Sequence, residues 1–278
     1  MQKKVWFVAL IGRPNSGKST FINYLIWEKV SIISPKPQTT RKVIKWIYND
    51  HNSQIVFFDT PWVNEIWKDF NLALNEKAYE SIKDADLVVR FIDSTRGYWN
   101  EEQIIEDFLS KIDKKVIEAY SKCDVSEKKD DKKFSISWVT WEWLKELIEE
   151  IKKYLPEWNS FYDDDYYTDQ DIYTRVTEII REKIFLYFED EIPHSAFVEI
   201  EDLEELPNIL KFNVTIFTET DSQKYIIIWK WWSNLTKIWT EARKELEEIF
   251  GKKIFIGLKV KTMPKWRKNK KVIGQILK

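Results

Sequence analysis

A phosphate-binding pattern near the N-terminus constrains this chain more than any other feature of its sequence. The segment Gly12–Thr20 has the form G-x-x-x-x-G-K-[ST]; the apolar run Val5–Ile11 precedes it, and a helical pattern begins near Lys18. Backbone N–H groups of such a loop form an anion site at the helix N-terminus. A glycine turn that only joins strand to helix is the alternative. The residues expected at the phosphate site are Gly12, Asn15, Ser16, Gly17, Lys18, Ser19 and Thr20.

The first half of the chain alternates apolar runs with helical patterns. The further strands expected are Gln54–Phe58, Leu87–Ile92 and Lys115–Tyr120, and the further helices begin near Leu72, Glu101 and Trp141. This alternation predicts parallel strands with crossover helices, which form an α/β doubly wound sheet. Because ligands bind at the carboxyl ends of the strands in such sheets, we expect functional side chains directly after each strand.

Polar residues around the expected phosphate site are suited to hold a magnesium ion. Asp59 follows the strand Gln54–Phe58 and can bind Mg²⁺ through water, and the Ser19 hydroxyl can bind it directly. We expect Thr40, in the Ser/Thr-rich loop before that strand, to supply a second hydroxyl ligand. Lys18 is expected to reach the β- and γ-phosphates of a nucleotide. The candidate catalytic residues are therefore Lys18, Thr40 and Asp59.

The segment Ser121–Asp124 follows the expected strand Lys115–Tyr120 and is expected to read a base. Guanine presents N1–H and N2–H₂ donors side by side, and one carboxylate can accept from both. Adenine presents an acceptor at N1 and would leave that carboxylate unpaired. We therefore expect Asp124 to select GTP over ATP, with the stem of Lys122 packing over the base. A helix cap formed by Asp124 is the alternative.

Composition excludes several classes of protein. Hydrophobic residues make up 44% and charged residues 32% of the chain, which gives enough apolar material for cores and too much charge for a membrane-embedded protein. A length of 278 residues favours two domains. The single cysteine, Cys123, cannot form an internal disulfide, so we expect a reducing compartment and a cytoplasmic location.

The second half of the chain differs in pattern and in charge. Its expected elements are a helix over Ile172–Glu189, strands over Leu210–Thr218, Lys224–Ile228 and Ile254–Lys261, and a charged helix over Asn234–Phe250. Ten Lys or Arg residues and no acidic residue lie between Lys252 and Lys278, which favours a phosphate-facing surface, with a solvated tail as the alternative. The expected domain bounds are 1–160, an acidic linker over 161–171, and 172–278 with the basic C-terminal tail.

Five segments outside the phosphate loop narrow the choice of protein family. They are Val30–Ser34, Pro37–Arg41, Arg181–Lys183, Glu191–Ser195 and Pro264–Arg267. Together with the motifs above, they resemble the Era family of P-loop GTPases over nearly the whole chain. The resemblance implies a doubly wound P-loop GTPase domain followed by a smaller α+β domain of the KH type, which binds RNA.

The same resemblance implies ligands and partners. The implied cofactors are GTP/GDP and Mg²⁺, and the implied partners are small-subunit ribosomal RNA and the 30S subunit, in a switch protein that hydrolyses GTP and assists 30S assembly. A monomer is expected, DNA binding is not, and peripheral association with the cytoplasmic face of the membrane is a further expectation. Two alternatives stay open: a catalytically degenerate RNA-binding scaffold, and a ribosome-assembly GTPase of another branch.

The family pattern also assigns site residues. Those expected to contact GTP beyond the phosphate loop are Asp59, Thr60, Trp62, Ser121, Lys122, Asp124, Ser137 and Trp138. Those expected to contact RNA are Trp229, Lys230, Trp231, Trp232, Lys265, Arg267 and Lys268. Val63 stands where Ras-like enzymes place a water-orienting glutamine. Because an apolar side chain cannot orient water by hydrogen bonding, we expect slow intrinsic hydrolysis.

Glycine and tryptophan depart from the family pattern. The chain has 6 Gly and 15 Trp, and Ser121 stands where the family carries Asn. Eleven tryptophans fall where the family has, or readily accepts, glycine: Trp6, Trp27, Trp46, Trp62, Trp138, Trp141, Trp143, Trp158, Trp229, Trp232 and Trp239. Trp62 and Trp232 would place a large side chain where backbone must approach a ligand. We hypothesise that a codon read as glycine in the organism has been rendered as tryptophan.

Two charged residues interrupt otherwise apolar strands. Arg90 and Glu118 each lie three residues before a strand-end position, and the two strands are expected to be neighbours. We predict a buried ion pair between them, with exposure of both at a sheet edge as the alternative. His51 and His194 have no other potential metal ligands at a suitable spacing in the sequence, and we expect them at the surface or in turns.

Overall fold

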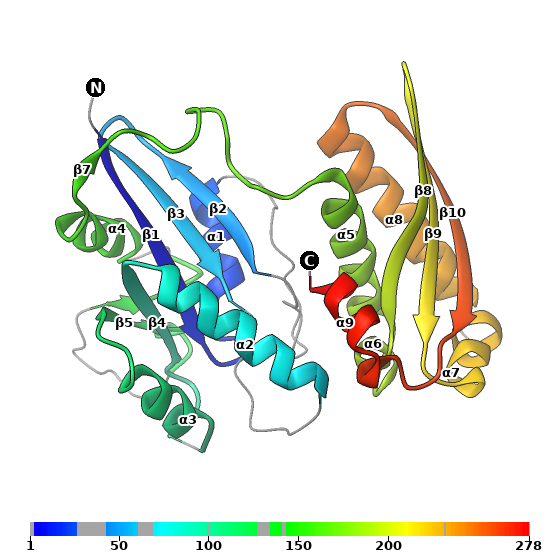
Figure 1. Ribbon diagram of the computed structural model, residues 1–278, viewed down its shortest axis with the longest axis horizontal. Coiled ribbons are helices and arrows are strands. Elements are labelled where there is room, and N and C mark those ends of the chain that lie inside the picture. Colours follow the sequence, from blue (N-terminus) through cyan, green and yellow to red (C-terminus); the bar gives the residue numbers. More distant parts are fainter. Residues whose placement is uncertain are drawn as a thin grey trace. The chain divides into compact units, whose positions relative to one another are not determined.

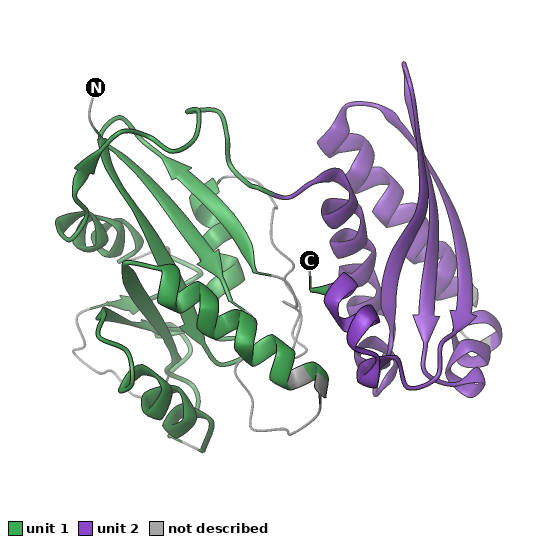
Figure 2. Ribbon diagram, viewed as in Figure 1, with its two compact units in different colours: residues 1–169, 277–278 green, residues 170–276 purple. Residues whose placement is uncertain are grey.

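The computed structural model describes residues 3–26, 43–60, 69–98, 100–126, 134–140, 143–230 and 232–277. The chain forms two compact units, one of residues 1–169 with 277–278 and the other of residues 170–276 (Figure 2). In the described part of the chain, no helix has the length and apolar character needed to span a membrane.

A seven-stranded sheet forms the centre of the first unit (Figure 1). Its strands are β1 (Lys3–Gly12), β2 (Ile44–Asn49), β3 (Ser53–Asp59), β4 (Leu87–Asp93), β5 (Lys115–Ser121), β6 (Ser135–Ile136) and β7 (Glu157–Trp158). Its helices are α1 (Lys18–Ile26), α2 (Asp69–Asp84), α3 (Asn100–Leu109) and α4 (Leu144–Lys153). The strand order is β2-β3-β1-β4-β5-β6, with β7 on β1, and only β2 and β7 pair antiparallel. This confirms the predicted doubly wound sheet.

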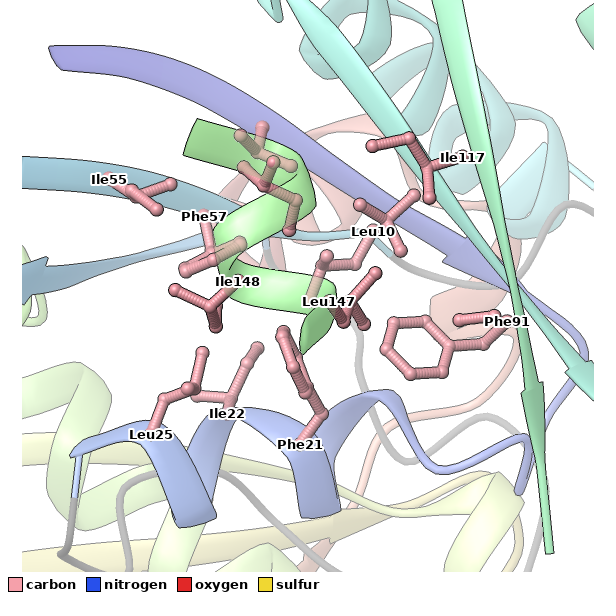
Figure 3. Packing of buried hydrophobic residues seen from close by; sticks show 14 of the residues in the cluster. Leu10, Phe21, Ile22, Leu25, Ile55, Phe57, Phe91, Ile117, Leu147 and Ile148 are labelled. Atoms are coloured by element: carbon pink, nitrogen blue, oxygen red, sulfur yellow. The ribbon is translucent and has the colours of Figure 1, made fainter. Parts of the chain in front are cut away.

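Apolar cores cover both faces of this sheet. On one face, Phe21 of α1 and Leu147 of α4 pack against strand residues (Figure 3). On the other face, the core includes Ile82 of α2 and Ile105 of α3. Strand β1 alternates between the two cores, with Val8 and Leu10 in the first and Ala9 and Ile11 in the second. Burial on both faces explains why this strand reads as one continuous apolar run.

The second unit is a three-stranded sheet packed against helices. Its strands are β8 (Phe197–Leu206), β9 (Ile209–Thr218) and β10 (Lys253–Thr262), in the order β10-β9-β8. Its helical elements are α5 (Ile172–Tyr187), α6 (Ile192–Ser195), α7 (Asp221–Tyr225), a π-helical turn (Ile226–Lys230), α8 (Trp232–Phe250), a 3₁₀ turn (Trp266–Lys268) and α9 (Lys270–Ile276). Strands β8 and β9 are antiparallel, whereas β9 and β10 are parallel. This small α+β unit confirms the predicted fold class of the second half.

One strand prediction in this unit is wrong. The segment Lys224–Ile228 is helical, although its run of isoleucines suggested a strand. Thr220 and Gln223 form a capping box that begins α7, and the π-helical turn then continues directly from that helix. Ile227 is fully buried in the core, so packing decided the conformation over β propensity.

The predicted contact between Arg90 and Glu118 is confirmed, but the burial of Glu118 is not. Arg90 is paired with Glu118 along the β4–β5 register, and an Arg90 Nη1 atom lies 3.3 Å from Glu118 Oε1. The Arg90 side chain is 6% exposed, while that of Glu118 is 43% exposed. Two carboxylates of α3 that the sequence did not suggest, Glu102 and Glu106, lie 2.8 and 3.0 Å from Arg90 Nη2. Buried Glu102 is therefore the main partner of the buried arginine.

The chain segment before α5 contacts the edge of the first sheet. The Ile47 N–H of β2 donates to Tyr167 O at 2.9 Å, and an isolated bridge joins Trp46 to Thr168. The Gln54 side chain accepts from the backbone N–H of Phe161 at 2.7 Å. Residues 161–169 therefore belong to the first unit by their contacts.

Candidate functional site

The loop between β1 and α1 has the backbone shape of an anion-binding turn. Gly17 has φ +94°, and Asn15 has φ 64°, both in the left-handed region. A Cβ atom at Gly12 would lie 2.5 Å from Phe91 O, so only glycine fits where β1 ends against β4. The Ser16 N–H donates to Arg13 O at 3.2 Å and closes the turn. Ser19 and Thr20 lie in the first turn of α1 and are partly exposed beside this loop.

A buried ammonium group lies inside this loop. Lys18 Nζ donates to Gly12 O at 2.8 Å and to Arg13 O at 3.4 Å. Burial lowers the pKa of Lys18, and the negative charge of Asp59 partly opposes this shift. Asp59 ends β3 and is fully buried, and the neighbouring Thr60 hydroxyl donates to Leu10 O at 2.7 Å. A cation and a carboxylate therefore meet at the carboxyl edge of the sheet, where phosphates and a metal ion can be held.

The segment after β5 lies at the same edge. Ser121 is buried, and its hydroxyl donates to Ile92 O at 3.3 Å. Lys122 has φ 59°, and its Nζ lies 2.6 Å from Asp93 Oδ2 at the end of β4. The Asp124 side chain is exposed and open to a ligand. The sequence motifs assigned no role to Asp93. Its position directly after a predicted strand is the signal that could have identified it.

A tryptophan ring packs directly against the phosphate loop. A Cβ atom built at Gly17 would lie 2.4 Å from Cζ2 of Trp138, so the indole lies against the Gly17 backbone. The ring also stacks on Phe91, with centroids 6.3 Å apart and planes inclined by 24°. The preceding residue, Ser137, accepts hydrogen bonds from the N–H groups of Val139 and Thr140 at 3.2 and 3.1 Å. The loop that the family pattern assigns to the base therefore contacts the phosphate loop through the Trp138 ring.

Several expected site residues lie outside the described part of the chain. They are Thr40, Trp62 and Trp231, and the hydrolysis expectation at Val63 lies there too. Lys230 ends the π-helical turn and Trp232 begins α8, but their side chains also lie outside the described part. Among the described residues, no group of three or more His, Cys, Asp or Glu side chains has the arrangement of a metal site. A magnesium ion held mainly by nucleotide phosphates does not require such a group.

The expected RNA-binding residues lie on two parts of the second unit. Trp229, near the end of the π-helical turn, is 77% exposed. Lys265, with φ 56°, precedes the 3₁₀ turn that carries Arg267 and Lys268. Arg267 Nη2 lies 3.4 Å from a carboxylate oxygen of Glu219. Trp266 is fully buried and donates its indole N–H to Ser195 O at 2.8 Å, so it anchors this basic turn.

Part of the basic C-terminal run is neutralised within the sheet. Lys252 lies 2.7 Å from Glu205, and both Lys259 and Lys261 pair with Glu201 of β8. These ion pairs connect the basic run to acidic residues of β8. Lys265 and Lys268 have no ion pair among the described residues, which leaves them available to a polyanion.

Comparison with known proteins gives matches over both units. A family model described as a 50S ribosome-binding GTPase matches residues 7–122, and one described as a KH domain matches residues 191–267. A protein of Thermotoga petrophila named GTPase Era is 38% identical over 291 residues, covering 99% of this chain and 97% of the relative. The GTPase Era of Fusobacterium nucleatum is 37% identical over 290 residues, covering 98% of each chain.

Two solved structures match nearly the full length. One is Era in complex with MgGDPNP and nucleotides 1506–1542 of 16S ribosomal RNA, with a TM-score of 0.91 and 33% identity, covering 99% of this chain and 98% of the other. The second is a variant of Aquifex aeolicus Era bound to GDP·AlF₄⁻, also with a TM-score of 0.91 and 33% identity, covering 98% of both chains.

Proposed function

This chain belongs to the Era family of GTPases, and from that premise we propose that its first unit binds and hydrolyses GTP while its second unit binds small-subunit ribosomal RNA. The observation that carries the nucleotide part is the phosphate loop, with Gly17 at φ +94° and buried Lys18 close to the Asp59 carboxylate. The RNA part follows from the KH match and from the relative solved with a segment of 16S ribosomal RNA. As a switch of this kind, the protein would assist assembly of the 30S subunit.

The phosphate end of the nucleotide would be held by the loop Gly12–Thr20. Its backbone N–H groups and the dipole of α1 favour negative charge. Lys18, which now donates to two loop carbonyls, would exchange these hydrogen bonds for phosphate oxygens. Ser19, Asp59 through water, and Thr40 would hold Mg²⁺, which neutralises charge on the transferred phosphate when bound. Lys18, Thr40 and Asp59 are the proposed catalytic residues.

The base end would be held by the two loops after β5 and β6. The exposed Asp124 carboxylate would accept from N1–H and N2–H₂ of guanine. The Lys122 stem would pack over the ring, and Ser121, Ser137 and residue 138 would complete the pocket. Ser121 donates to Ile92 O within the sheet, so it secures the loop in place of the longer asparagine of the family.

The RNA surface is proposed on residues 229–232 and on the turn Lys265–Lys268. Lys265 and Lys268, which have no ion pair among the described residues, would contact phosphates. Exposed Trp229 would stack on a base if the residue is tryptophan in the organism. Lys265→Ala combined with Lys268→Ala should weaken RNA binding and flatten its salt dependence. Lys211→Ala, which removes a lysine paired with Glu204, is the matched control and should leave RNA affinity unchanged.

One observation favours the degenerate-scaffold alternative. The Trp138 ring lies against Gly17, where backbone must remain open to a nucleotide. Trp138→Gly removes this ring, so we expect GDP affinity to rise by about tenfold or more in isothermal titration calorimetry. Trp138→Phe keeps a ring at this position and should not raise it. If neither the parent chain nor Trp138→Gly binds GDP or GTP, the GTPase proposal fails and the protein is a catalytically degenerate RNA-binding scaffold.

The cellular setting and the organisation of the chain complete the proposal. A cytoplasmic location agrees with the single free cysteine, and a monomeric state and peripheral contact with the membrane are proposed with it. Light scattering on the purified chain tests the monomer, and sedimentation with vesicles tests the membrane contact. We propose domain bounds of 1–160 and 172–278 with a connecting segment 161–171, of which residues 161–169 pack on the first unit. Limited proteolysis tests these bounds.

A further inference from the structure

The end of strand β4 carries a carboxylate that the proposed nucleotide contacts do not include. Asp93 is the last residue of β4, and its side chain is 0% exposed. Asp93 Oδ2 lies 2.6 Å from Lys122 Nζ and 3.4 Å from Arg96 Nε. Asp93 Oδ1 accepts from the Thr95 N–H at 3.0 Å and from the Thr95 hydroxyl at 2.6 Å. Every oxygen of this buried carboxylate is therefore engaged.

These contacts fix the carboxylate as an anion. Burial alone would raise the pKa of Asp93, but hydrogen bonds from Lys122 and Thr95 outweigh it and lower the pKa. Breaking one side of such a buried, charge-assisted pair leaves the other group without compensation. The Lys122 ammonium, whose side chain is only 27% exposed, is thus held on one particular oxygen.

The same short loop also holds the backbone on either side of the base-reading segment. The Ser94 N–H donates to Ser121 O at 3.0 Å, and the Ser126 hydroxyl donates to Ser94 O at 3.0 Å. Ser94 Oγ lies 3.5 Å from Cys123 Sγ. Lys122 itself has φ 59°, a left-handed conformation that is unfavourable for a residue with a side chain. The surrounding contacts maintain that conformation.

The other end of this loop reaches the phosphate loop. Arg13, 7% exposed in its side chain, donates through Nη1 to Gly97 O at 3.3 Å. Its Nη2 lies 2.6 Å from Glu101 at the start of α3. Residues 93–97 therefore contact both the loop proposed to hold the phosphates and the loop proposed to hold the base. A nucleotide that spans the two loops requires a fixed separation between them.

We propose that Asp93 is a positioning residue of the guanine site, which acts by holding Lys122 in place for the base, with residues 94–97 linking that loop to the phosphate loop. Asp93 does not touch the nucleotide in this arrangement, because its oxygens face Lys122, Thr95 and Arg96. This inference rests on the proposed function, since it concerns the site that the function assigns to GTP.

A double-mutant cycle separates positioning from a general structural role. The full chain is loaded with methylanthraniloyl-GDP, and its dissociation rate is measured by stopped-flow fluorescence. Asp93→Asn should speed dissociation by about tenfold, the scale of one hydrogen bond to a charged group. In a Lys122→Met background, Asp93→Asn should change the rate by less than about twofold, because its partner is already absent. Asp86→Asn is the control. Asp86 directly precedes β4, at the end of the strand opposite to Asp93, so this variant should leave the dissociation rate unchanged.

Thr95→Val provides a second probe that keeps the buried charge. Thr95 is exposed, and the variant removes only the hydroxyl that donates to Asp93. It should speed dissociation by about two- to threefold in the parent chain and leave the rate unchanged in the Lys122→Met background. Thr95→Val therefore tests whether Asp93 acts through Lys122 even if Asp93→Asn does not fold.

The possible results are distinct. Equal acceleration by Asp93→Asn in both backgrounds overturns the proposal, because Asp93 would then act on the fold and not through Lys122. An unchanged rate in the parent chain also overturns it while leaving GDP binding, and so the proposed function, intact. Failure of both the parent chain and Trp138→Gly to bind GDP or GTP refutes the proposed function itself, and the positioning role with it.

Discussion

Residue 143 offers a direct test of whether this chain requires glycine where tryptophan stands. Trp143 precedes α4 with φ 63° and ψ 2°, makes no side-chain cap hydrogen bond, and is 44% exposed. A left-handed conformation costs an L residue about 1–2 kcal/mol, whereas glycine adopts it freely. Glycine in an ordinary position is instead less stable than alanine by about 0.5–1 kcal/mol because of its chain entropy.

The comparison of two small residues isolates this effect from the loss of the indole. Trp143→Gly and Trp143→Ala both remove the ring and differ only in the Cβ atom. Their difference combines about 1–2 kcal/mol of strain with about 0.5–1 kcal/mol of opposing entropy, so Trp143→Gly should be the more stable by about 1 kcal/mol. In a unit of this size, that is about 2–4 °C in the melting temperature measured by differential scanning calorimetry.

Trp158 is the matched control for this experiment. It is also exposed, but it lies in β7 and is not among the described residues with positive φ. There, Trp158→Ala should be more stable than Trp158→Gly by about 0.5–1 kcal/mol, the opposite order. If both positions show the same order, the argument from backbone strain is wrong. The codons give independent evidence: the eleven tryptophans at glycine positions should share a single codon, and mixed codons would refute the glycine hypothesis.

Three further outcomes follow from the geometry. Arg90→Met should lower the free energy of unfolding by about 3–5 kcal/mol in urea, because buried Glu102 loses its close partner, whereas Arg96→Met, at a side chain 39% exposed, should cost less than about 1 kcal/mol. The pKa of Asp50 is about 2, below 3.8, because hydrogen bonds led by that from Lys152 outweigh its burial. Its contribution to stability is therefore complete above 3.8 and lost as the pH falls towards 2, so the difference in stability between the parent and Asp50→Asn should vanish over that window in acid titrations. Asp124→Asn should weaken GDP and strengthen xanthosine diphosphate binding, because an amide can donate to the carbonyl that replaces the guanine amino group; unchanged selectivity would exclude Asp124 as the base reader.

The parts of the fold that local patterns dictate could be predicted from the sequence. The phosphate loop could be predicted because its two glycines and its lysine lie within one nine-residue segment, between an apolar run and a helical pattern. Strands β3 and β4 could be predicted too, since their apolar runs are buried by the sheet, and so could β5, where Ile117 and Ala119 are buried. Strands β2 and β8 did not stand out, because polar and charged residues interrupt their apolar pattern.

The site was less accessible to prediction wherever it depends on contacts between distant residues. Lys122 could be assigned from its motif, but its partner Asp93 is 29 residues away in sequence and is brought near by the pairing of β4 with β5. The pair of Arg90 and Glu118 followed from strand register, whereas Glu102 joined it through the docking of α3, which no register predicts. Periodicity identifies buried faces, but it does not specify which polar side chains meet there.

The most direct test of the central claim measures RNA affinity in the two nucleotide states. Fluorescence anisotropy of the full chain with an RNA of the sequence of nucleotides 1506–1542 of 16S ribosomal RNA, at fixed salt, gives Kd with MgGDPNP and with MgGDP. A nucleotide switch that controls RNA binding should tighten Kd by about tenfold in the GDPNP state, within the usual range of coupling between two sites. Equal affinities in GDPNP, in GDP and without nucleotide would contradict the account.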